Sequence, residues 1–481
     1  MSGLSARAYF AALLVVLPVG CTREAPVRRQ TVVVIDTDLF GADDVRANPD
    51  VTLAAIDTVR VDVLDAANNV SVFREFSASS PLDWPLSFAL MPPTEGVVGP
   101  TRLRVRGYRA RDAESIIERD PNDDAGVPTL SPFPELAVDR VVEIPVAAPE
   151  TVARVLVMLS GACMAKPASF GEKANCVDGE TRPFSEPLPT VDANYTSRVG
   201  TTTLGRVEPC GEPAAEGRVC IPGGLSLLGS RRLAGFVGDQ PNRSTYPQRL
   251  VRVSPFYADV FEMTVVRARR WYDKLTRKPG RVGEPNLSVS EHCTYSDERA
   301  ANDYPLNCIF IDTAEELCAL EGGRLPTEAE WNHMATGRGL GWSFPWGEQL
   351  AECCRTSTGR GTKTGPITKG VCAGQGPEEV GAHRGAFCDD IGDRSRDGVL
   401  DLGGSMIEAL TDTLLPLDNP CWGPRFGVLV DPQCRDRPVD VFRGGRGGDF
   451  STNPIGALSS LRREWSRGVI SGVRCVYPVK R

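Results

Sequence analysis

Polar and apolar residues alternate along much of the first third of the chain. Residues 59–63 (VRVDV) and 103–106 (LRVR) place an apolar side chain at every second position. This period of two is typical of a β-strand with one buried face. Other short apolar stretches, separated by turn residues, predict strands at 32–35, 70–76, 86–90, 141–146 and 152–159. Seven short strands predict an all-β N-terminal domain at residues 31–159, an antiparallel sandwich of immunoglobulin-like type.

Two segments of this half lack a clear pattern. Residues 160–218 are rich in Pro, Gly and Thr and predict a loop-rich connector braced by disulfides, with a poorly packed extension of the sandwich as the alternative. Residues 120–134 begin with DPNDD, which holds three aspartates in five positions. Clustered carboxylates raise the idea of a calcium loop, but no glutamate or glycine follows at the EF-hand spacing. We therefore favour a solvated surface loop at 120–134.

The middle of the chain changes to helical spacing between residues 313 and 346. Two pairs of the form T-x-x-E, Thr313/Glu316 and Thr327/Glu330, predict capping boxes at the starts of two helices. A Gly-Gly pair ends the first helix, and the residue before Pro326 disfavours helix, so a short extended entry precedes the second. The second helix is expected to bury its tryptophan.

A further helix is predicted at residues 261–275. Val265, Ala268, Trp271, Tyr272 and Leu275 recur there at helical spacing. We interpret the two aromatic side chains as core residues rather than as a ligand cage.

The N-terminus has the form of an export signal. Arg7 precedes an apolar run at 10–19, which is too short to span a bilayer as a mature helix, and Gly20-Cys21 follows. Residues 1–20 are therefore predicted to be a signal peptide and 21–30 a tether. The segment before Cys21 is similar to a bacterial lipobox, so Cys21 is the predicted lipidation site, and the Thr that follows points to the outer membrane. The alternative is an ordinary signal peptide with a chance cysteine.

Charge and cysteine content narrow the class of protein. The 481 residues carry a formal net charge of −8 without a Lys/Arg block, which argues against nucleic-acid binding. Of the 15 cysteines, 14 remain after Cys21, enough for up to seven disulfides in an oxidising compartment. Spacing makes the pairs 163–176, 210–220 and 421–434 plausible. With three histidines and no CxxC pair, a zinc site is not expected.

Short sequence motifs in the second half of the chain resemble those of a known family. GGRLPTEAEW followed by FPWG resembles the signature of the formylglycine-generating-enzyme (sulfatase-modifying factor) family. Further matching segments follow the family order: IPGG and LGS within 221–230, SPFYADVFEMT at 254–264, DGVLDLGGSMIEALTD at 397–412, VFRGG at 441–445 and GVRC at 472–475. The resemblance implies that residues 219–481 form an α+β domain, a variant of the C-type lectin fold with long loops.

The resemblance also implies an oxidase that converts a sulfatase cysteine to formylglycine. That activity uses two cysteines, five positions apart after the RGG motif, which bind copper(I), a metal that prefers soft thiolates. Here these positions fall near Thr452 and Ala457. Neither side chain can bind copper or exchange a disulfide, so copper is not expected and no catalytic residue is carried over. The nearby Cys475 is interpreted as structural.

Other chemistries find less support in the sequence. The iron-dependent sulfoxide synthases of this fold use a histidine triad from a helical domain, and three scattered histidines do not match it. Ser405 lies in no G-x-S-x-G elbow with a partnered histidine. The acidic segment with Asp389, Asp390 and Asp393 is interpreted as a solvated loop.

A calcium site is the family feature that survives best. By resemblance, its ligands would be the carboxylates of Asp401 and Glu408 and the main-chain carbonyls of Gly404 and Met406, a hard-oxygen set suited to calcium. Ser405 replaces the family's asparagine in this turn. The family's second calcium site would fall at 351–356, where a Cys-Cys pair replaces Ala-Asn, and we do not carry it over.

The sequence thus predicts a lipid-anchored protein of the bacterial cell envelope, facing the periplasm or the surface. Its sulfatase-modifying-factor-like domain would be a binding or structural module without oxidase activity, with an envelope protein or glycan as its ligand. The alternative is a divergent oxidase that acts on a protein substrate through other residues. A thiolate pair or histidine cluster in 443–465 would favour the oxidase, and that segment contains neither.

Overall fold

The structure is a computed structural model. It describes residues 30–91, 100–120, 123–145, 147, 151–231, 233, 245–280, 292–295, 302–361, 372, 374–385, 391–436 and 442–480. The predicted signal peptide, Cys21, Asp389 and Asp390 lie outside these residues.

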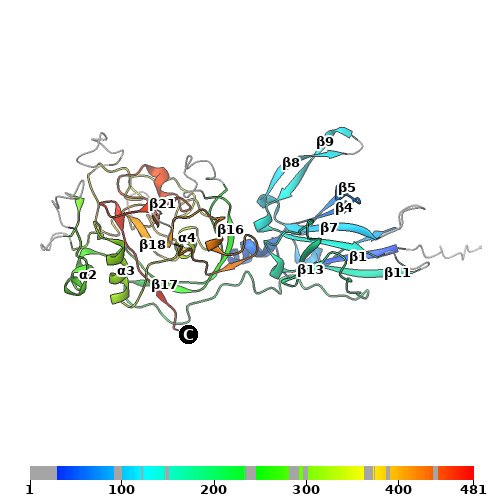
Figure 1. The fold of residues 1–481 in the computed structure, drawn as a ribbon, viewed down its shortest axis with the longest axis horizontal. Helices are drawn as coiled ribbons and strands as arrows, with labels where there is room; N and C mark the ends of the chain where they lie inside the picture. Colours follow the sequence, from blue (N-terminus) through cyan, green and yellow to red (C-terminus); the bar gives the residue numbers. More distant parts are fainter. Residues whose placement is uncertain are drawn as a thin grey trace, which may run out of the picture.

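Two β-sheets that share one hydrophobic core form the N-terminal half (Figure 1). The first has the order β11-β1-β6 and the second β10-β7-β4-β5. Their bounds are β1 Gln30–Thr37, β4 Thr58–Leu64, β5 Val70–Ser77, β6 Leu86–Leu90, β7 Thr101–Tyr108, β10 Val138–Ile144 and β11 Val152–Leu159. All seven predicted strands are confirmed. One pairing differs from the antiparallel prediction, because β1 runs parallel to β11. The immunoglobulin-like topology stays a prediction.

The segment predicted as a solvated loop is largely a β-hairpin. β8 (Ala113–Asp120) pairs with β9 (Asp123–Pro132), so the prediction of a loop at 120–134 is wrong for residues 123–132. The hairpin contacts the outer face of the neighbouring sheet, where Arg60 donates to the carbonyl of Leu130 at 3.3 Å. Arg60 and Arg106 both pair with the carboxylate of Asp62 at 2.6 Å, and all three side chains are largely buried. The alternating pattern therefore predicted this strand correctly, but it did not predict that the polar face of the strand is buried.

Small elements complete this half and the connector. They are β2 (Phe40–Gly41) paired with β3 (Ala55–Ile56), the short helix α1 (Asp44–Ala47), and the hairpin of β12 (Ala174–Val177) and β13 (Glu180–Pro183). The predicted disulfides Cys163–Cys176 and Cys210–Cys220 are both present and brace the connector.

In the described residues of the C-terminal half, the structure has three small sheets and three short helices (Figure 1). The sheet orders are β14-β17-β23, β15-β16-β19 and β21-β20-β18-β22. The strands are β14 Arg218–Ile221, β15 Gly224–Leu228, β16 Arg249–Val253, β17 Phe256–Asp259, β18 Ile407–Thr413, β19 Leu429–Val430, β20 Arg443–Arg446, β21 Arg462–Trp465, β22 Ser471–Gly472 and β23 Val476–Pro478. The helices are α2 Val265–Arg269, α3 Ile311–Leu320 and α4 Glu328–Ala335. Most of the other described residues in this half lie in loops, as the resemblance implied.

The start of α4 has the capping box that the sequence predicts. The Thr327 hydroxyl accepts a hydrogen bond from the Glu330 amide at 3.1 Å, and the Glu330 carboxylate accepts one from the Thr327 amide at 2.8 Å. This reciprocal pair satisfies two backbone donors that the helix leaves free. Trp331 is fully buried, as expected.

The other predicted cap is wrong. α3 begins at Ile311, so Thr313 lies inside the helix, and its hydroxyl donates to the carbonyl of Arg277. Glu316 instead accepts hydrogen bonds from the amide and hydroxyl of Thr276. The side chain that the pattern assigned to a cap therefore fixes a neighbouring loop.

The predicted helix at 261–275 is shorter than expected. Only Val265–Arg269 is α-helical, and Tyr272–Lys274 form a separate 3-10 turn. Met263 explains the late start, because its amide donates to Val473 and its carbonyl accepts from Leu306. A residue bonded to two distant segments cannot also enter a helical ladder.

A buried ion cluster joins α4 to the largest sheet of the C-terminal half. The Glu328 carboxylate accepts hydrogen bonds from Arg446 of β20 at 2.8 Å and from Arg462 of β21 at 2.6 Å. All three side chains are at most 1% exposed. Burial by itself would raise the pKa of Glu328, but the two guanidinium groups outweigh it and lower that pKa to about 2.

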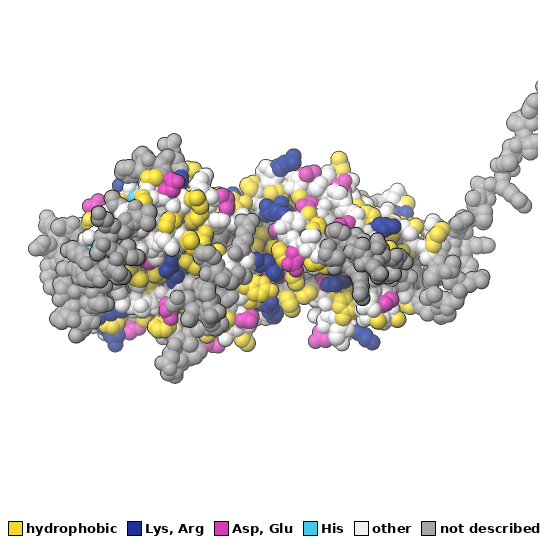
Figure 2. Space-filling view, turned by 90° about the horizontal axis from the view of Figure 1, so that it is seen from above, with side chains coloured by type: hydrophobic (Ala, Val, Ile, Leu, Met, Phe, Trp, Pro, Cys, Tyr) yellow, Lys and Arg dark blue, Asp and Glu magenta, His cyan; other side chains and the backbone are white. Residues whose placement is uncertain are grey.

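The two halves contact one another directly. Leu225 and Leu250 of the C-terminal half belong to the same hydrophobic cluster as the N-terminal sheets. Asp50 pairs with Arg396 at 2.6 Å and with Arg338 at 3.3 Å across the junction. Hydrophobic and basic side chains are both visible at this junction in Figure 2.

We expect Glu328→Gln to lower the free energy of unfolding by about 3–5 kcal/mol, because it leaves two buried arginines without their counter-charge. Urea unfolding followed by tryptophan fluorescence measures this loss. Since the folded pKa is depressed, the wild-type contribution is fully present above the ordinary pKa of 4.5 and is lost as pH falls towards about 2. The matched control is the exposed Glu379→Gln, which should stay within about 0.5 kcal/mol of wild type. Equal losses in the two variants would contradict the assignment.

Candidate functional site

The turn predicted to bind calcium lies deep in the C-terminal half. Asp401 is 4% exposed, and its backbone adopts the left-handed conformation, with a φ of 64°. Gly404 follows in a position that excludes a side chain, because a Cβ there would lie 2.4 Å from the carbonyl oxygen of Ser357. Met406 and Glu408 are fully buried. The structure thus brings the four predicted residues into one buried turn and the strand that follows it.

Glu408 is held by two protein donors. One carboxylate oxygen accepts from the Trp331 indole at 2.7 Å, and the other accepts from the Arg474 guanidinium at 2.6 and 2.9 Å. Arg474 also donates to the carbonyls of Asp259, Val260 and Leu400. One buried guanidinium therefore joins three segments that lie far apart in the sequence.

Glu262 is a buried carboxylate that the sequence reasoning did not single out. It accepts hydrogen bonds from the Ser405 hydroxyl and the Met406 amide, both at 3.0 Å. Burial and the negative charges of Asp401 and Glu408 raise the pKa of Glu262 well above its ordinary value. The signal was present in the FEMT motif, where a glutamate stands between apolar residues.

These contacts do not favour calcium at this turn. Both Glu408 oxygens already accept hydrogen bonds, and the nearby Arg474 charge would repel a second cation. One Asp401 oxygen accepts from the Gly381 amide at 2.6 Å, and burial raises the pKa of Asp401 to about 6. Within the described ranges, no three His, Cys, Asp or Glu side chains are grouped closely enough to hold a metal ion. Calcium binding stays a prediction, and we derive no role from it.

Asp393 is not the solvated residue that its acidic segment predicted. It is 1% exposed, and one of its oxygens accepts a hydrogen bond from the Thr356 hydroxyl at 2.5 Å. Burial and the charge of Asp401 raise the pKa of Asp393 to about 7. The solvated-loop prediction is therefore wrong at this position, because the loop folds inward against the 356–358 segment.

The positions expected for the copper-binding cysteines are filled by ordinary packing. The Thr452 hydroxyl donates to the carbonyl of Asp449 at 2.9 Å and accepts from its amide at 3.2 Å, which closes a local turn. Ala457 is 1% exposed and belongs to an apolar cluster with Phe344 and Trp346. Neither residue presents a sulfur ligand or a thiol nucleophile.

The cysteines that the structure describes serve as cross-links. Six disulfides join pairs of described residues: 163–176, 210–220, 293–308, 318–475, 353–372 and 421–434. The three pairs predicted from spacing are confirmed. The bond between Cys318 and Cys475 confirms that Cys475 is structural.

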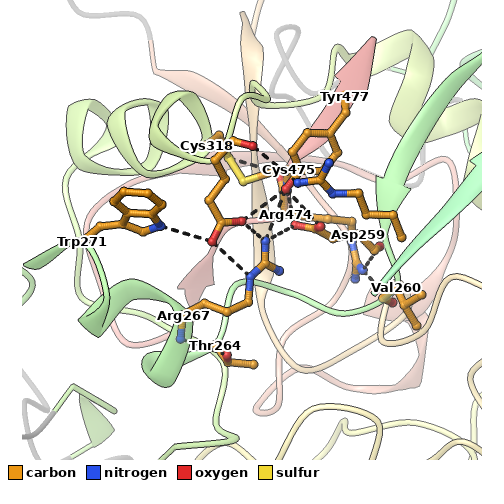
Figure 3. Close-up of polar contacts among 11 residues, drawn as sticks. Asp259, Val260, Thr264, Arg267, Trp271, Cys318, Arg474, Cys475 and Tyr477 are labelled. Carbon is orange, nitrogen blue, oxygen red and sulfur yellow. Dashed lines mark hydrogen bonds and ion pairs between the residues drawn. A yellow bond between two sulfur atoms is a disulfide. The ribbon is translucent and has the colours of Figure 1, made fainter. Parts of the chain in front are cut away.

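A polar cavity of about 630 Å³ lies beside α2, and its charged side chains largely pair with one another. Arg267 donates to Asp259 at 2.9 Å and also to Glu321 (Figure 3). The Trp271 indole donates to Glu321 at 3.3 Å, and the Tyr477 hydroxyl donates to Asp259 at 3.1 Å. This network cross-links α2, α3, β17 and β23, so we interpret it as structural.

Comparison with known protein families gives a match to the C-terminal half of the chain. Residues 205–478, more than half of its length, match the family model described as "Sulfatase-modifying factor enzyme 1-like domain". The chain therefore belongs to this family. The matched region begins before the predicted boundary at 219 and includes part of the connector.

Individual relatives are distant. The curated protein YfmG of Bacillus subtilis, described as uncharacterized, is 26% identical over 147 residues, which is 28% of this chain and 28% of YfmG. Among solved structures, PvdO from Pseudomonas aeruginosa is 19% identical, with 57% of this chain and 98% of PvdO covered and a TM-score of 0.34. Treponema denticola variable protein 1 (15% identity, 54% and 94% covered, TM-score 0.37) and CarF (16% identity, 55% and 98% covered, TM-score 0.32) are also similar.

Proposed function

We propose that this protein is a binding module of the bacterial cell envelope, in which a sulfatase-modifying-factor-like domain has lost the formylglycine-generating activity. The observation that carries the proposal is the pair Thr452 and Ala457. One hydroxyl closes a local turn, and one methyl group packs beside Phe344 and Trp346. Oxidation of a substrate thiol by the family chemistry needs two thiolates that bind copper(I), and neither position supplies one.

A rigid scaffold supports the binding role. Long loops lose much conformational entropy on folding and need cross-links to stay ordered. Here the six disulfides between described residues and the buried Glu328 and Glu408 ion clusters supply those cross-links. Binding residues are often carried on loops that a fixed frame positions.

Export and anchoring at Cys21 belong to the same proposal. The six disulfides are typical of a protein that folds in an oxidising compartment. In the part of the chain that the structure describes, no helix has the length and apolarity to cross a bilayer. A lipid on Cys21 would supply the membrane attachment, with two or three acyl chains giving a stable anchor.

The first test is a copper(I) titration against a colorimetric chelator. We expect the purified wild-type chain to leave the copper with the chelator, because a hydroxyl and a methyl group are not soft ligands. The double variant Thr452→Cys/Ala457→Cys is the matched comparison, since it restores sulfur at these two positions. Stoichiometric removal of copper by the wild-type chain would overturn the proposal.

The anchor is tested by growing cells with labelled palmitate. We expect label in the wild-type chain and none in Cys21→Ser, because only the cysteine thiol can carry the lipid. Label retained by the variant, or absent from both chains, would contradict anchoring at Cys21.

A further inference from the structure

We propose that the cleft between the two halves of the chain binds a neutral sugar of one to three rings. The inference rests on the proposed binding function and names the site and the ligand class. The cleft has a volume of about 450 Å³, within the range of small-molecule sites. Asp112 and Phe133 line it from the N-terminal half, and Gln248, Leu340 and Ser460 line it from the C-terminal half.

Apolar side chains from both halves supply a surface for the carbon face of a sugar ring. Leu53, Phe133 and Leu136 come from one half, and Leu227 and Leu340 come from the other. Covering a ring's C–H groups removes apolar surface from water, whereas its hydroxyl groups must still find partners. A ligand for this cleft therefore needs both an apolar face and many hydrogen-bonding groups.

Asp112 offers unused hydrogen-bond acceptors. Its side chain is 20% exposed, and its closest cation, Arg111, lies 3.7 Å away, beyond hydrogen-bond distance. Among the described residues, no hydrogen bond reaches its carboxylate, although its amide and carbonyl are paired with Arg109 and Phe133. A half-buried carboxylate with free oxygens is well suited to accept hydrogen bonds from ligand hydroxyl groups.

Neutral polar residues line the same cleft as Asp112. Gln248 donates its amide to the carbonyl of Gly229, which leaves its side-chain oxygen as an acceptor. Ser230 and Ser460 also line the cleft, and a serine hydroxyl can both donate and accept. Hydroxyl-rich ligands match such a mixture, because each sugar hydroxyl also donates and accepts.

Charge argues against ionic ligands. Arg111 and Arg231 line the same cleft, and because Arg231 is paired with Glu135, Arg111 is the guanidinium group that a cation near Asp112 would meet. An anion would be repelled by Asp112, whose half-buried charge is weakly screened. A neutral ligand avoids both costs.

The cleft is held open by contacts on its borders. Arg231 pairs with Glu135 at 2.8 Å across the junction and stacks 4.0 Å from the Phe133 ring centroid. The ion pairs of Asp50 with Arg338 and Arg396 fix the two halves at a second point. A site that is already formed loses little entropy when a ligand binds.

Isothermal titration calorimetry tests the assignment on the chain without its signal peptide. The probes are maltotriose, cellotriose and tri-N-acetylchitotriose as neutral sugars, with trilysine and trigalacturonate as charged comparators. We expect at least one neutral sugar to bind more tightly than either charged probe. Binding by none of the three neutral sugars, or tighter binding of a charged probe, would overturn the proposal.

Three variants locate the binding. We expect Asp112→Asn to weaken the sugar at least about tenfold, because hydrogen bonds to a charged acceptor are the strong ones. Ser460→Trp, on the opposite wall, should abolish binding by filling the cleft. The exposed Asp43→Asn in the same half is the control and should bind as wild type does. Unchanged affinity in both Asp112→Asn and Ser460→Trp would place the sugar elsewhere and overturn the assignment. These results are independent of the copper titration, because that experiment tests copper binding at residues 452 and 457.

Discussion

The C-terminal half depends on the buried ion pairs that one glutamate carboxylate makes with two arginines. Glu328 is fully buried between Arg446 and Arg462, and its amide donates to Asp412. Three residues later, Trp331 donates to Glu408, which in turn holds Arg474. An unpaired buried charge costs several kcal/mol, so helix, sheet and closing strand are strongly held in this arrangement. These two buried ion clusters form a fixed frame in a domain that has little regular structure.

Under the proposed function, this frame keeps the family fold in a chain without the family activity. The ion clusters and the disulfide 318–475 lie in elements that do not include residues 452 and 457. On this proposal, a turn-forming threonine and a packed alanine stand where the family has two thiols, and the frame does not depend on them. Fold and chemistry are separable in many superfamilies.

Local patterns predicted the elements whose causes are local. Period-two alternation located β4 and β7, short spacing predicted three disulfides, and the T-x-x-E pair at Thr327 predicted the start of α4. Each depends on residues within a few positions of one another, or on a short covalent loop. The family resemblance then supplied the fold of the C-terminal half, which periodicity alone could not.

The misses share a different cause. Met263 is drawn out of a helix by backbone bonds to Val473 and Leu306, and Asp393 is buried by its contact with Thr356. Arg60 is covered by a hairpin about seventy positions away. Glu262 acquires its raised pKa from carboxylates that meet it only in the folded chain. Long-range packing decided each of these, and no local pattern carries that information.

The most direct measurement is mass spectrometry of a Cys-x-Pro-x-Arg sulfatase peptide after incubation with the purified chain, copper and oxygen. An active formylglycine-generating enzyme, run in parallel, shows that the conditions support the reaction. A binding module without the thiolate pair leaves the peptide cysteine unchanged while the control converts it. Conversion of that cysteine to the aldehyde by this chain would contradict the account and require an oxidising site outside residues 452 and 457.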